Sequence, residues 1–351
     1  MKSAIPIQNL YYLLCYAWNR LEEKDTIDVA SLDTAQVANL FARVLASGTQ
    51  HVMKRGFDRG YIDFAEDTGR LRGRIDFAGS LKRNLFARAM ARCEFDDLDY
   101  NVLHNRILKS TIADLIRVEG LDAEHKEALG NALRRLREVD QVPLSGQIFR
   151  RVQLHRNNNY YRFLLNVCEL IHSQLLVSQE DGKRRFRDFL RDEVAMRALF
   201  EDFVKNFYSV EQSRYQIKAK KVQWAVEPDD DGMPDFLPEM KTDVCLISKD
   251  RKIILDCKYY QESMQAYHGT PKARSTNLYQ LFAYLKNQEL VSGWEDCEGI
   301  LLYPTVNEPL DFECRLHGHR VRIVSIDLNQ EWQAIERDLL NLVDAARVFT
   351  T

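Results

Sequence analysis

Two apolar runs separated by a polar turn constrain the fold of this 351-residue chain more than any other segment. Residues 242–247 read Thr-Asp-Val-Cys-Leu-Ile, residues 248–251 are polar, and residues 252–259 read Lys-Ile-Ile-Leu-Asp-Cys-Lys-Tyr. Short runs of aliphatic residues on both sides of a tight polar turn are typical of an antiparallel β-hairpin. Because both runs are nearly all apolar, we expect both faces of these strands to be buried in a sheet.

The register of this hairpin predicts where three charged side chains meet. If Lys249 and Asp250 form a two-residue loop, residues equidistant from the loop face one another, so Asp243 lies opposite Asp256. Side chains alternate between the two faces of a strand, which puts Lys258 on the same face as Asp256. Opposed carboxylates repel, and a divalent cation such as Mg²⁺ relieves that repulsion. The pattern predicts a metal site beside an ammonium group; the alternative is a solvated sheet edge that binds nothing.

Regular elements are expected on both sides of the hairpin. A strand-like stretch at 215–226 ends at a loop rich in Pro, Asp and Gly. Apolar periodicity predicts further helices and strands, so the second half of the chain should combine one sheet with flanking helices. The expected helices lie at 189–208, 277–286 and 330–343, and the expected strands at 299–303 and 321–327.

The order helix, three strands with D…D-x-K, helix, strand resembles the core of the PD-(D/E)xK nucleases. The resemblance implies an α/β fold with a C-terminal restriction-endonuclease-like domain, a mixed sheet flanked by helices. The apolar patterns of residues 1–185 predict that a mixed α+β or mostly helical N-terminal domain precedes it. It implies that Asp243, Asp256 and Lys258 are catalytic. It also implies that Glu201 on the preceding helix completes the metal shell of the two aspartates, with Glu193 as a fallback. The alternative for Glu201 is an exposed helix carboxylate.

The RecB-like branch of this superfamily carries Q-x-x-x-Y on the helix after the catalytic strand. Gln280 and Tyr284 match that motif, and their i, i+4 spacing places both on one helix face, toward the site or the substrate. The alternative is ordinary helix surface. The Pro of the family motif is loosely matched by Pro238, five residues before Asp243.

Landmarks along nearly the whole chain resemble the McrC family, the nuclease subunits of McrBC modification-dependent restriction systems. These landmarks are Asn9–Trp18, Arg72–Phe77, Asn105–Thr111, Tyr160–Phe163, Leu237–Asp243, Asp256–Tyr260 and Asn277–Leu281. The resemblance implies Mg²⁺-dependent cutting, with Mn²⁺ as a substitute, of double-stranded DNA that carries modified cytosine. It also implies docking to an McrB-like AAA+ GTPase hexamer and stimulation of that GTPase.

GTP is then used only through the partner subunit, because this sequence contains no G-x-x-x-x-G-K-[ST] loop. The same resemblance leaves room for dimerisation of the nuclease domain. Two alternatives stay open. The first is a catalytically silent scaffold that activates and bridges the GTPase, and the second is a nuclease that works without a motor.

Polar residues interrupt the apolar periodicity at 178–183, so we expect one domain at 1–185 and another at 186–351. The resemblance implies that the first docks the GTPase and that the second is the endonuclease domain. Alternating apolar residues at 61–64 and 71–77 predict a hairpin. Helical periodicity is found at 10–18, 34–45, 101–118, 124–139 and 160–176.

The stretch from Arg70 to Arg92 is locally basic, with seven Lys or Arg side chains opposed within it only by Asp76. Three environments suit such a stretch. It would meet an acidic pore surface of the partner, the DNA backbone, or solvent with ion pairs to residues elsewhere.

Composition argues against several other classes of protein. A net charge of −3 does not fit a protein that coats nucleic acid through bulk charge, and no run of about 18 apolar residues or signal-like start is present, so we expect a cytoplasmic protein. The seven scattered cysteines are expected to be buried free thiols. His317 and His319 fit a turn better than a zinc site, and Cys257 should face away from Asp256.

Overall fold

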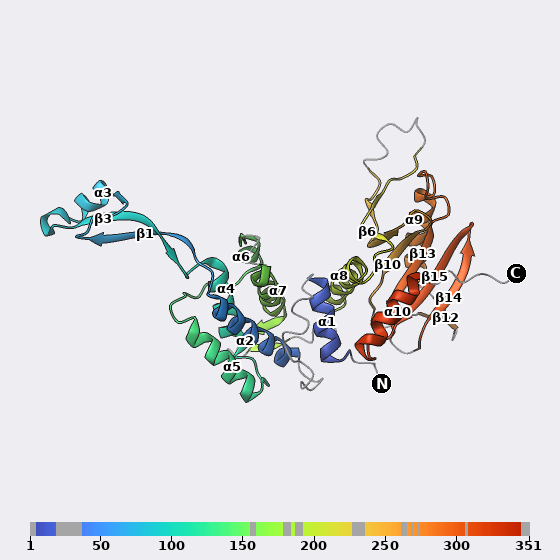
Figure 1. The fold of residues 1–351 in the computed structure, drawn as a ribbon, viewed down its shortest axis with the longest axis horizontal. Helices are drawn as coiled ribbons and strands as arrows, with labels where there is room; N and C mark the ends of the chain where they lie inside the picture. Colours follow the sequence, from blue (N-terminus) through green and yellow to red (C-terminus); the bar gives the residue numbers. More distant parts are fainter. Residues whose placement is uncertain are drawn as a thin grey trace. The chain divides into compact units, whose positions relative to one another are not determined.

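The computed structural model describes residues 5–18, 37–154, 159–177, 184–186, 192–226, 236–260, 265–267, 270–272, 274–305 and 308–344 (Figure 1). The chain forms two compact units. Residues 1–35 and 188–351 make up one, here called the sheet unit, and residues 36–187 make up the other, here called the helical unit. This grouping differs from the expected division after residue 185, because the first 35 residues belong with the C-terminal part of the chain.

A six-stranded mixed sheet forms the centre of the sheet unit, in the order β14-β15-β13-β10-β9-β6. β10, β13 and β15 are parallel to one another, whereas the remaining neighbours pair antiparallel. The α/β class with a mixed sheet and helices is therefore confirmed. The strands are Gln216–Lys218 (β6), Val244–Ile247 (β9), Lys252–Cys257 (β10), Glu298–Pro304 (β13), Asp311–Leu316 (β14) and His319–Ile326 (β15).

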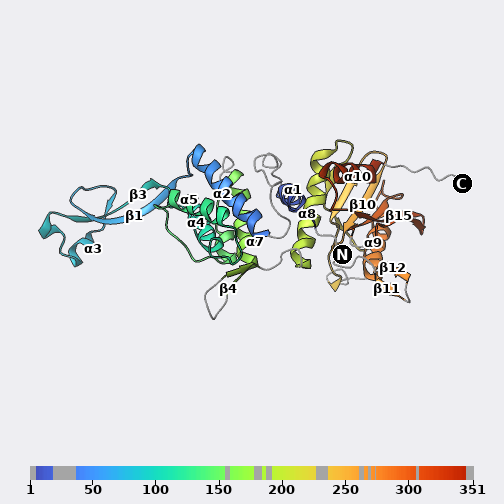
Figure 2. The ribbon, with the colours of Figure 1, turned by 90° about the horizontal axis from the view of Figure 1, so that it is seen from below.

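Helices cover both faces of this sheet. Leu281 and Leu285 of α9 (Ser275–Gln288) share one buried apolar cluster with Ile254 and Leu301 of the central strands. Figure 2 shows α10 on the opposite face of the sheet from α9. The remaining elements of this part of the unit are α8 (Glu193–Glu211), α10 (Trp332–Asp344) and two short strand pairs, β7 (Lys221–Val222) with β8 (Met240–Lys241) and β11 (Gln265–Tyr267) with β12 (Thr270–Lys272).

The first helix, α1 (Ile7–Ala17), belongs to the core of the sheet unit because its aromatic face packs on α8 and α10. The Tyr16 ring stacks on Trp332 with the centroids 5.3 Å apart, and it meets Phe203 of α8 edge-on at 5.8 Å. The amide of Asn9 donates to two backbone carbonyl oxygens just before α10, at 2.9 and 2.8 Å. Each aromatic pair of this kind stabilises the fold by roughly 0.5–1.5 kcal/mol, in addition to the hydrophobic contribution of the surface that it buries.

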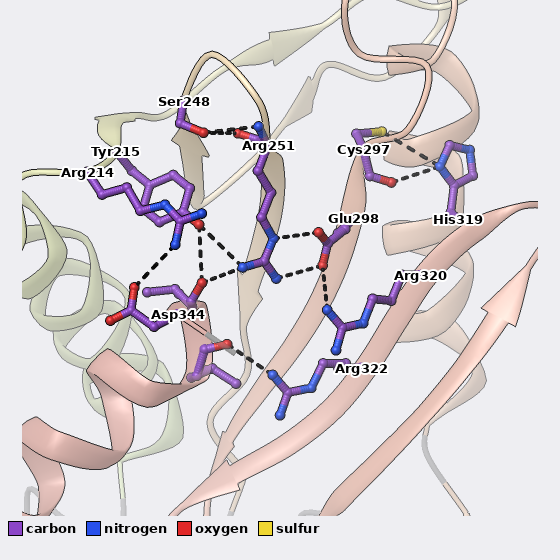
Figure 3. A network of polar contacts seen from close by, with 12 residues as sticks. Arg214, Tyr215, Ser248, Arg251, Cys297, Glu298, His319, Arg320, Arg322 and Asp344 are labelled. Atoms are coloured by element: carbon purple, nitrogen blue, oxygen red, sulfur yellow. Dashed lines mark hydrogen bonds and ion pairs between the residues drawn. The ribbon is translucent and has the colours of Figure 1, made fainter. Parts of the chain in front are cut away.

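An ion-pair network ties the amino ends of β10, β13 and β15 to the end of α10 (Figure 3). The Glu298 carboxylate accepts two hydrogen bonds from Arg251, at 2.5 and 2.8 Å, and pairs with Arg320 at 3.3 Å. Arg251 and Arg322 also donate to backbone carbonyl oxygens in the last turn of α10. Guanidinium groups at a helix carboxyl end stabilise the helix dipole, so this network fixes α10 on the sheet.

Glu298→Ala is expected to destabilise the protein by about 3 kcal/mol, because it removes the carboxylate that pairs with the nearly buried guanidinium of Arg251 and one of the two that pair with Arg320. Urea unfolding measures this change in the free energy of unfolding. The matched control is Glu239→Ala, which breaks an exposed pair with Lys221 at 2.7 Å and should cost less than about 1 kcal/mol. Equal losses in the two variants would contradict the structural role of the network.

The helical unit consists of a helix group and a long strand ribbon that extends away from the helices (Figure 1). Its three-stranded sheet has the order β1-β3-β2, and β4 pairs with β5. Of the described helices of the whole chain, none is both long and apolar enough to cross a membrane. The elements are α2 (Val37–Arg55), β1 (Gly60–Thr68), β2 (Arg74–Ile75), α3 (Phe77–Lys82), η2 (Phe86–Arg88), β3 (Ala91–Asp99), α4 (Leu103–Leu115), α5 (Ala123–Arg135), α6 (Gly146–Arg150), α7 (Asn159–Gln174), β4 (Leu175–Val177) and β5 (Arg184–Phe186).

The hairpin expected between residues 61–64 and 71–77 is wrong. β1 pairs instead with β3, from Gly60 opposite Asp99 to Thr68 opposite Ala91, and β2 adds to the other side of β3. The alternating pattern at 71–77 does not continue as a strand, because Asp76 caps helix α3, which begins at Phe77. The Asp76 carboxylate accepts a hydrogen bond from the Gly79 backbone N–H at 2.9 Å.

Residues 69–90, here called the ribbon tip, connect β1 to β3 and contain most of the basic stretch. Charges from the flanking strands neutralise part of it, through Arg72–Glu66 and Arg83–Asp67 pairs at 2.7 and 3.0 Å. The tip also exposes large apolar side chains, a feature that composition did not reveal. These are Leu71 (66%), Phe77 (63%), Leu81 (69%) and Phe86 (43%).

Candidate active site

The hairpin register brings Asp243 and Asp256 together as predicted. β9 and β10 pair antiparallel from Ile247 opposite Lys252 to Val244 opposite Leu255, so the next pair in this register is Asp243 with Asp256. Asp243 precedes β9 by one residue, and its Oδ2 accepts a hydrogen bond from the backbone N–H of Cys257 at 2.8 Å. This bond fixes one carboxylate at the carboxyl end of β10, where parallel strands commonly present functional groups.

Asp256 and Lys258 form a buried ion pair at the same end of β10. Asp256 is fully buried and Lys258 is 8% exposed, and Lys258 Nζ lies 2.7 Å from Asp256 Oδ2. Among the described residues, no side chain or backbone group hydrogen-bonds to Asp256 Oδ1. A buried carboxylate oxygen without a donor is costly, which makes this atom a ready ligand for a cation.

The carboxylates of this site have raised pKa values. Burial raises the pKa of Asp256 to about 6, with Asp243 adding to the rise and Lys258 opposing it. Burial also raises the pKa of Asp243, although the hydrogen bond from Cys257 and the charge of Lys258 act against it. For Lys258, burial lowers the pKa, but the charges of Asp256 and Asp243 outweigh it, so the pKa is raised and the ammonium form is retained.

Glu201 on α8 faces the same cluster. Burial and the charge of Asp243 raise its pKa to about 7, while Lys258 and Arg197 lower it. Glu193 is the first residue of α8, about 12 Å along the helix axis from Glu201 at 1.5 Å per residue. Of the two glutamates named from the sequence, the structure therefore brings Glu201 to the aspartates.

Gln280 and Tyr284 lie on α9 and form one hydrogen-bonded chain. The Gln280 amide donates to the Tyr284 hydroxyl at 2.6 Å, and that hydroxyl donates to the backbone oxygen of Lys241 at 2.8 Å. Tyr284 is 3% exposed, whereas Gln280 is exposed. The pair thus holds the strand that leads into Asp243, which is a positioning contact.

The residues of the site suit a divalent cation, but the ligand set is not closed. Across the described part of the chain, no three His, Cys, Asp or Glu side chains form a group that could hold a metal ion. One oxygen of Asp243 is engaged by the Cys257 backbone, and one of Asp256 by Lys258. The free oxygen of Asp256 and the raised carboxylate pKa values still fit hard-cation chemistry, since Mg²⁺ takes one or two carboxylates and completes its shell with water.

Sequence reasoning did not single out Arg197, although its charge acts on both Glu201 and Asp243. Arg197 precedes Glu201 by four residues, so the two side chains share one face of α8. The helical periodicity that placed Glu201 could have found it.

The histidines near residue 318 and the cysteines have structural roles. His317 and Gly318 both adopt positive φ, which is the expected turn, and His319 lies between the Cys297 carbonyl oxygen at 2.8 Å and the Glu289 carboxylate at 2.7 Å. Cys257 is fully buried, and burial raises the pKa of its thiol, so it is unreactive. All seven cysteines are free, and all but Cys314 are buried.

The sequence of this chain matches a known protein family. The family model described as "McrBC 5-methylcytosine restriction system component" matches residues 6–304. The chain belongs to this family. It is also 30% identical over 343 residues to the "Type IV methyl-directed restriction enzyme EcoKMcrBC" of Escherichia coli strain K12, a match that covers 98% of both chains. An McrBC-family chain with this coverage has a role in a type IV restriction system.

One solved structure has a fold similar to that of this chain. It is a half-complex from a tetradecameric assembly of Thermococcus gammatolerans McrB AAA+ hexamers with bound McrC. The similarity covers 96% of this chain and 76% of that one, with a TM-score of 0.57 and 16% identity. At this identity the similarity concerns the fold.

Proposed function

We propose that this chain is an McrC-like endonuclease subunit that hydrolyses DNA phosphodiesters with Mg²⁺ in a type IV restriction system. The observation that carries the proposal is the buried Asp256, paired with Lys258 and in register with Asp243. Gln280 and Tyr284, together with the mixed sheet, support a PD-(D/E)xK domain of the RecB-like branch.

Asp256 would be the first ligand of the cation, because its Oδ1 accepts no hydrogen bond from the described residues. Asp243 and Glu201 are the further ligands proposed, and both would have to move to close a shell that the described side chains do not form in this structure. A bound Mg²⁺, or Mn²⁺ in its place, would supply stabilisation of the charge that develops on phosphate oxygens. Lys258 keeps its proton, because the neighbouring aspartates raise its pKa. Its ammonium therefore acts as a donor that orients the attacking water or a phosphate oxygen, and it does not accept a proton.

The partner proposed for this chain is an McrB-like AAA+ GTPase hexamer. Two observations support it: the related solved structure contains such hexamers with bound McrC, and this sequence has no P-loop of its own. GTP then acts only through the partner, and recognition of modified cytosine in double-stranded DNA belongs to the partner as well. The helical unit is the proposed docking part, with the ribbon tip as its contact.

The proposal is tested by mixing this chain with its AAA+ partner, GTP and Mg²⁺ on methylated and unmethylated duplex DNA. We expect cleavage of the methylated duplex only, lost when EDTA removes the metal or when either protein is left out. GTPase stimulation without any cleavage would contradict the proposal and favour the alternative, a catalytically silent scaffold that activates and bridges the GTPase.

A further inference from the structure

Tyr260, two residues beyond Lys258, lies under two arginine side chains from different helices. The guanidinium carbon of Arg274, the N-cap residue of α9, is 3.9 Å from the centre of the Tyr260 ring. The corresponding carbon of Arg197, on α8, is 5.7 Å from the same ring centre. Both cations thus gather at the carboxyl end of β10, beside the candidate active site.

The Tyr260 ring is fixed in place by a chain of hydrogen bonds. Its hydroxyl donates to Asn277 Oδ1 at 3.1 Å, and the Asn277 amide donates to the Tyr303 hydroxyl at 2.9 Å. Asn277 is 4% exposed and Tyr303 is fully buried, so both are rigid supports. Tyr260 is therefore a fixed surface on which the Arg274 guanidinium rests and over which the Arg197 guanidinium lies at a greater distance.

A guanidinium that lies over an aromatic ring keeps its in-plane N–H donors available for other groups. The Nε atom of Arg197 is buried and hydrogen-bonds to no atom of the described residues, and Arg197 forms no ion pair with any described carboxylate. Its charge reaches Glu201 and Asp243, which places it at the edge of the carboxylate cluster. Arg197 therefore keeps donor capacity that no described group uses.

A phosphate group is the anion that fits these two cations. The three carboxylates of the site repel a DNA backbone, and the positive amino end of α9 beside Arg274 attracts it. Arginine binds phosphate oxygens in a bidentate manner through its planar fork of donors. We propose that Arg197 and Arg274, supported by Tyr260, bind a phosphodiester next to the one that is cut; this rests on the endonuclease function proposed above.

The test uses the full complex with the AAA+ partner and compares Arg197→Ala, Arg274→Ala and the control Arg337→Ala, which removes an exposed arginine of α10. Each of the first two variants should raise KM for methylated duplex DNA about tenfold with little change in kcat, because it weakens binding of a non-reacting phosphate. Each should also reduce the slope of log binding constant against log salt by about 1. Arg197→Lys and Arg274→Lys should recover part of the loss, and Arg337→Ala should change neither quantity.

Tyr260 is a positioning residue in this proposal. Tyr260→Phe keeps the ring and should keep KM within about threefold of the wild type, whereas Tyr260→Leu should match the arginine variants in both KM and salt slope. If the alanine variants of both arginines bind duplex DNA with the wild-type salt slope, the phosphate site is refuted and the cations serve only packing.

Binding is measured in an Asp256→Asn background as well, so that no cleavage is needed. A wild-type complex that never cuts DNA would refute the proposed endonuclease function. The salt slopes of the arginine variants in the uncut complex would still decide whether this phosphate site exists.

Discussion

Asp256→Asn is expected to lower Mg²⁺-dependent cleavage of methylated DNA by about 10³-fold or more, while the melting temperature stays equal or rises. The rate falls because a neutral amide is a poor ligand for a hard cation. In the proposed mechanism the bound cation would stabilise the charge of the transition state by several kcal/mol. Single-turnover cleavage with the AAA+ partner and GTP measures it. Partner binding and GTPase stimulation should persist, because both are assigned to the helical unit.

The stability of this variant follows from the pKa of the aspartate. In the folded protein the pKa of Asp256 is about 6, above its ordinary value of 3.8. Between these values the folded state binds more protons than the unfolded state, so the stability contributed by Asp256 falls as the pH rises from about 4 to 6. At pH 7 the ionised carboxylate destabilises the fold, and asparagine removes that charge.

A second variant of the site and a matched control accompany this prediction. Lys258→Ala should lower the cleavage rate by roughly 10²- to 10³-fold, the usual effect of losing one hydrogen-bond donor to the transition state. Asp250→Asn is the matched control, because Asp250 is exposed in the turn of the same hairpin, and it should cut like the wild type. Cleavage at the wild-type rate by Asp256→Asn or Lys258→Ala would overturn the assignment of the site.

Removal of the ribbon tip is expected to reduce GTP hydrolysis by the mixture to the basal rate of the AAA+ partner alone. Thr68 and Ala91 are cross-strand partners, so an Asn-Gly turn between them can replace residues 69–90 and close the ribbon as a hairpin. The tip exposes apolar side chains and cations together, the composition of a surface that awaits a protein partner. GTPase rate and partner binding are the measurements.

Point variants separate the two parts of the tip. Leu71→Ser, Phe77→Ser and Leu81→Ser together test its apolar surface. Arg70→Ala, Lys82→Ala and Arg88→Ala together test those cations of the tip that form no ion pair among the described residues. If the chain that lacks the whole tip still stimulates the GTPase, this segment is ruled out as the docking contact. DNA cleavage at the wild-type rate by that chain would likewise show that docking lies elsewhere.

Local geometry explains what the sequence predicted well. The pairing of β9 with β10 depends only on a short turn and the two-residue period of strands, so the positions of Asp243, Asp256 and Lys258 follow from a few neighbouring residues. Helices α8, α9 and α10 were likewise expected from apolar periodicity, within a few residues of their ends.

Long-range contacts explain what the sequence did not predict. β14 has a mixed exposed pattern with Phe312 in solvent, so it lacks the alternation of a half-buried strand and is defined by its pairing with β15. The pairing of β1 with β3 spans the whole ribbon tip, which no local pattern reveals. The contact of Tyr260 with Arg197 joins two elements far apart in the chain, so the sequence alone did not show it.

The position of α1 in the sheet unit has a consequence for synthesis on the ribosome. Tyr16 of α1 hydrogen-bonds to Glu211 of α8, 195 residues later in the chain. At about 5–20 residues per second, α1 leaves the ribosome roughly 10–40 s before that partner exists. The helical unit is completed in that interval, while the buried face of α1 (Leu10, Leu13, Leu14) is still without its partner. A chaperone that covers this apolar face of α1 during the interval would keep it from associating with other chains.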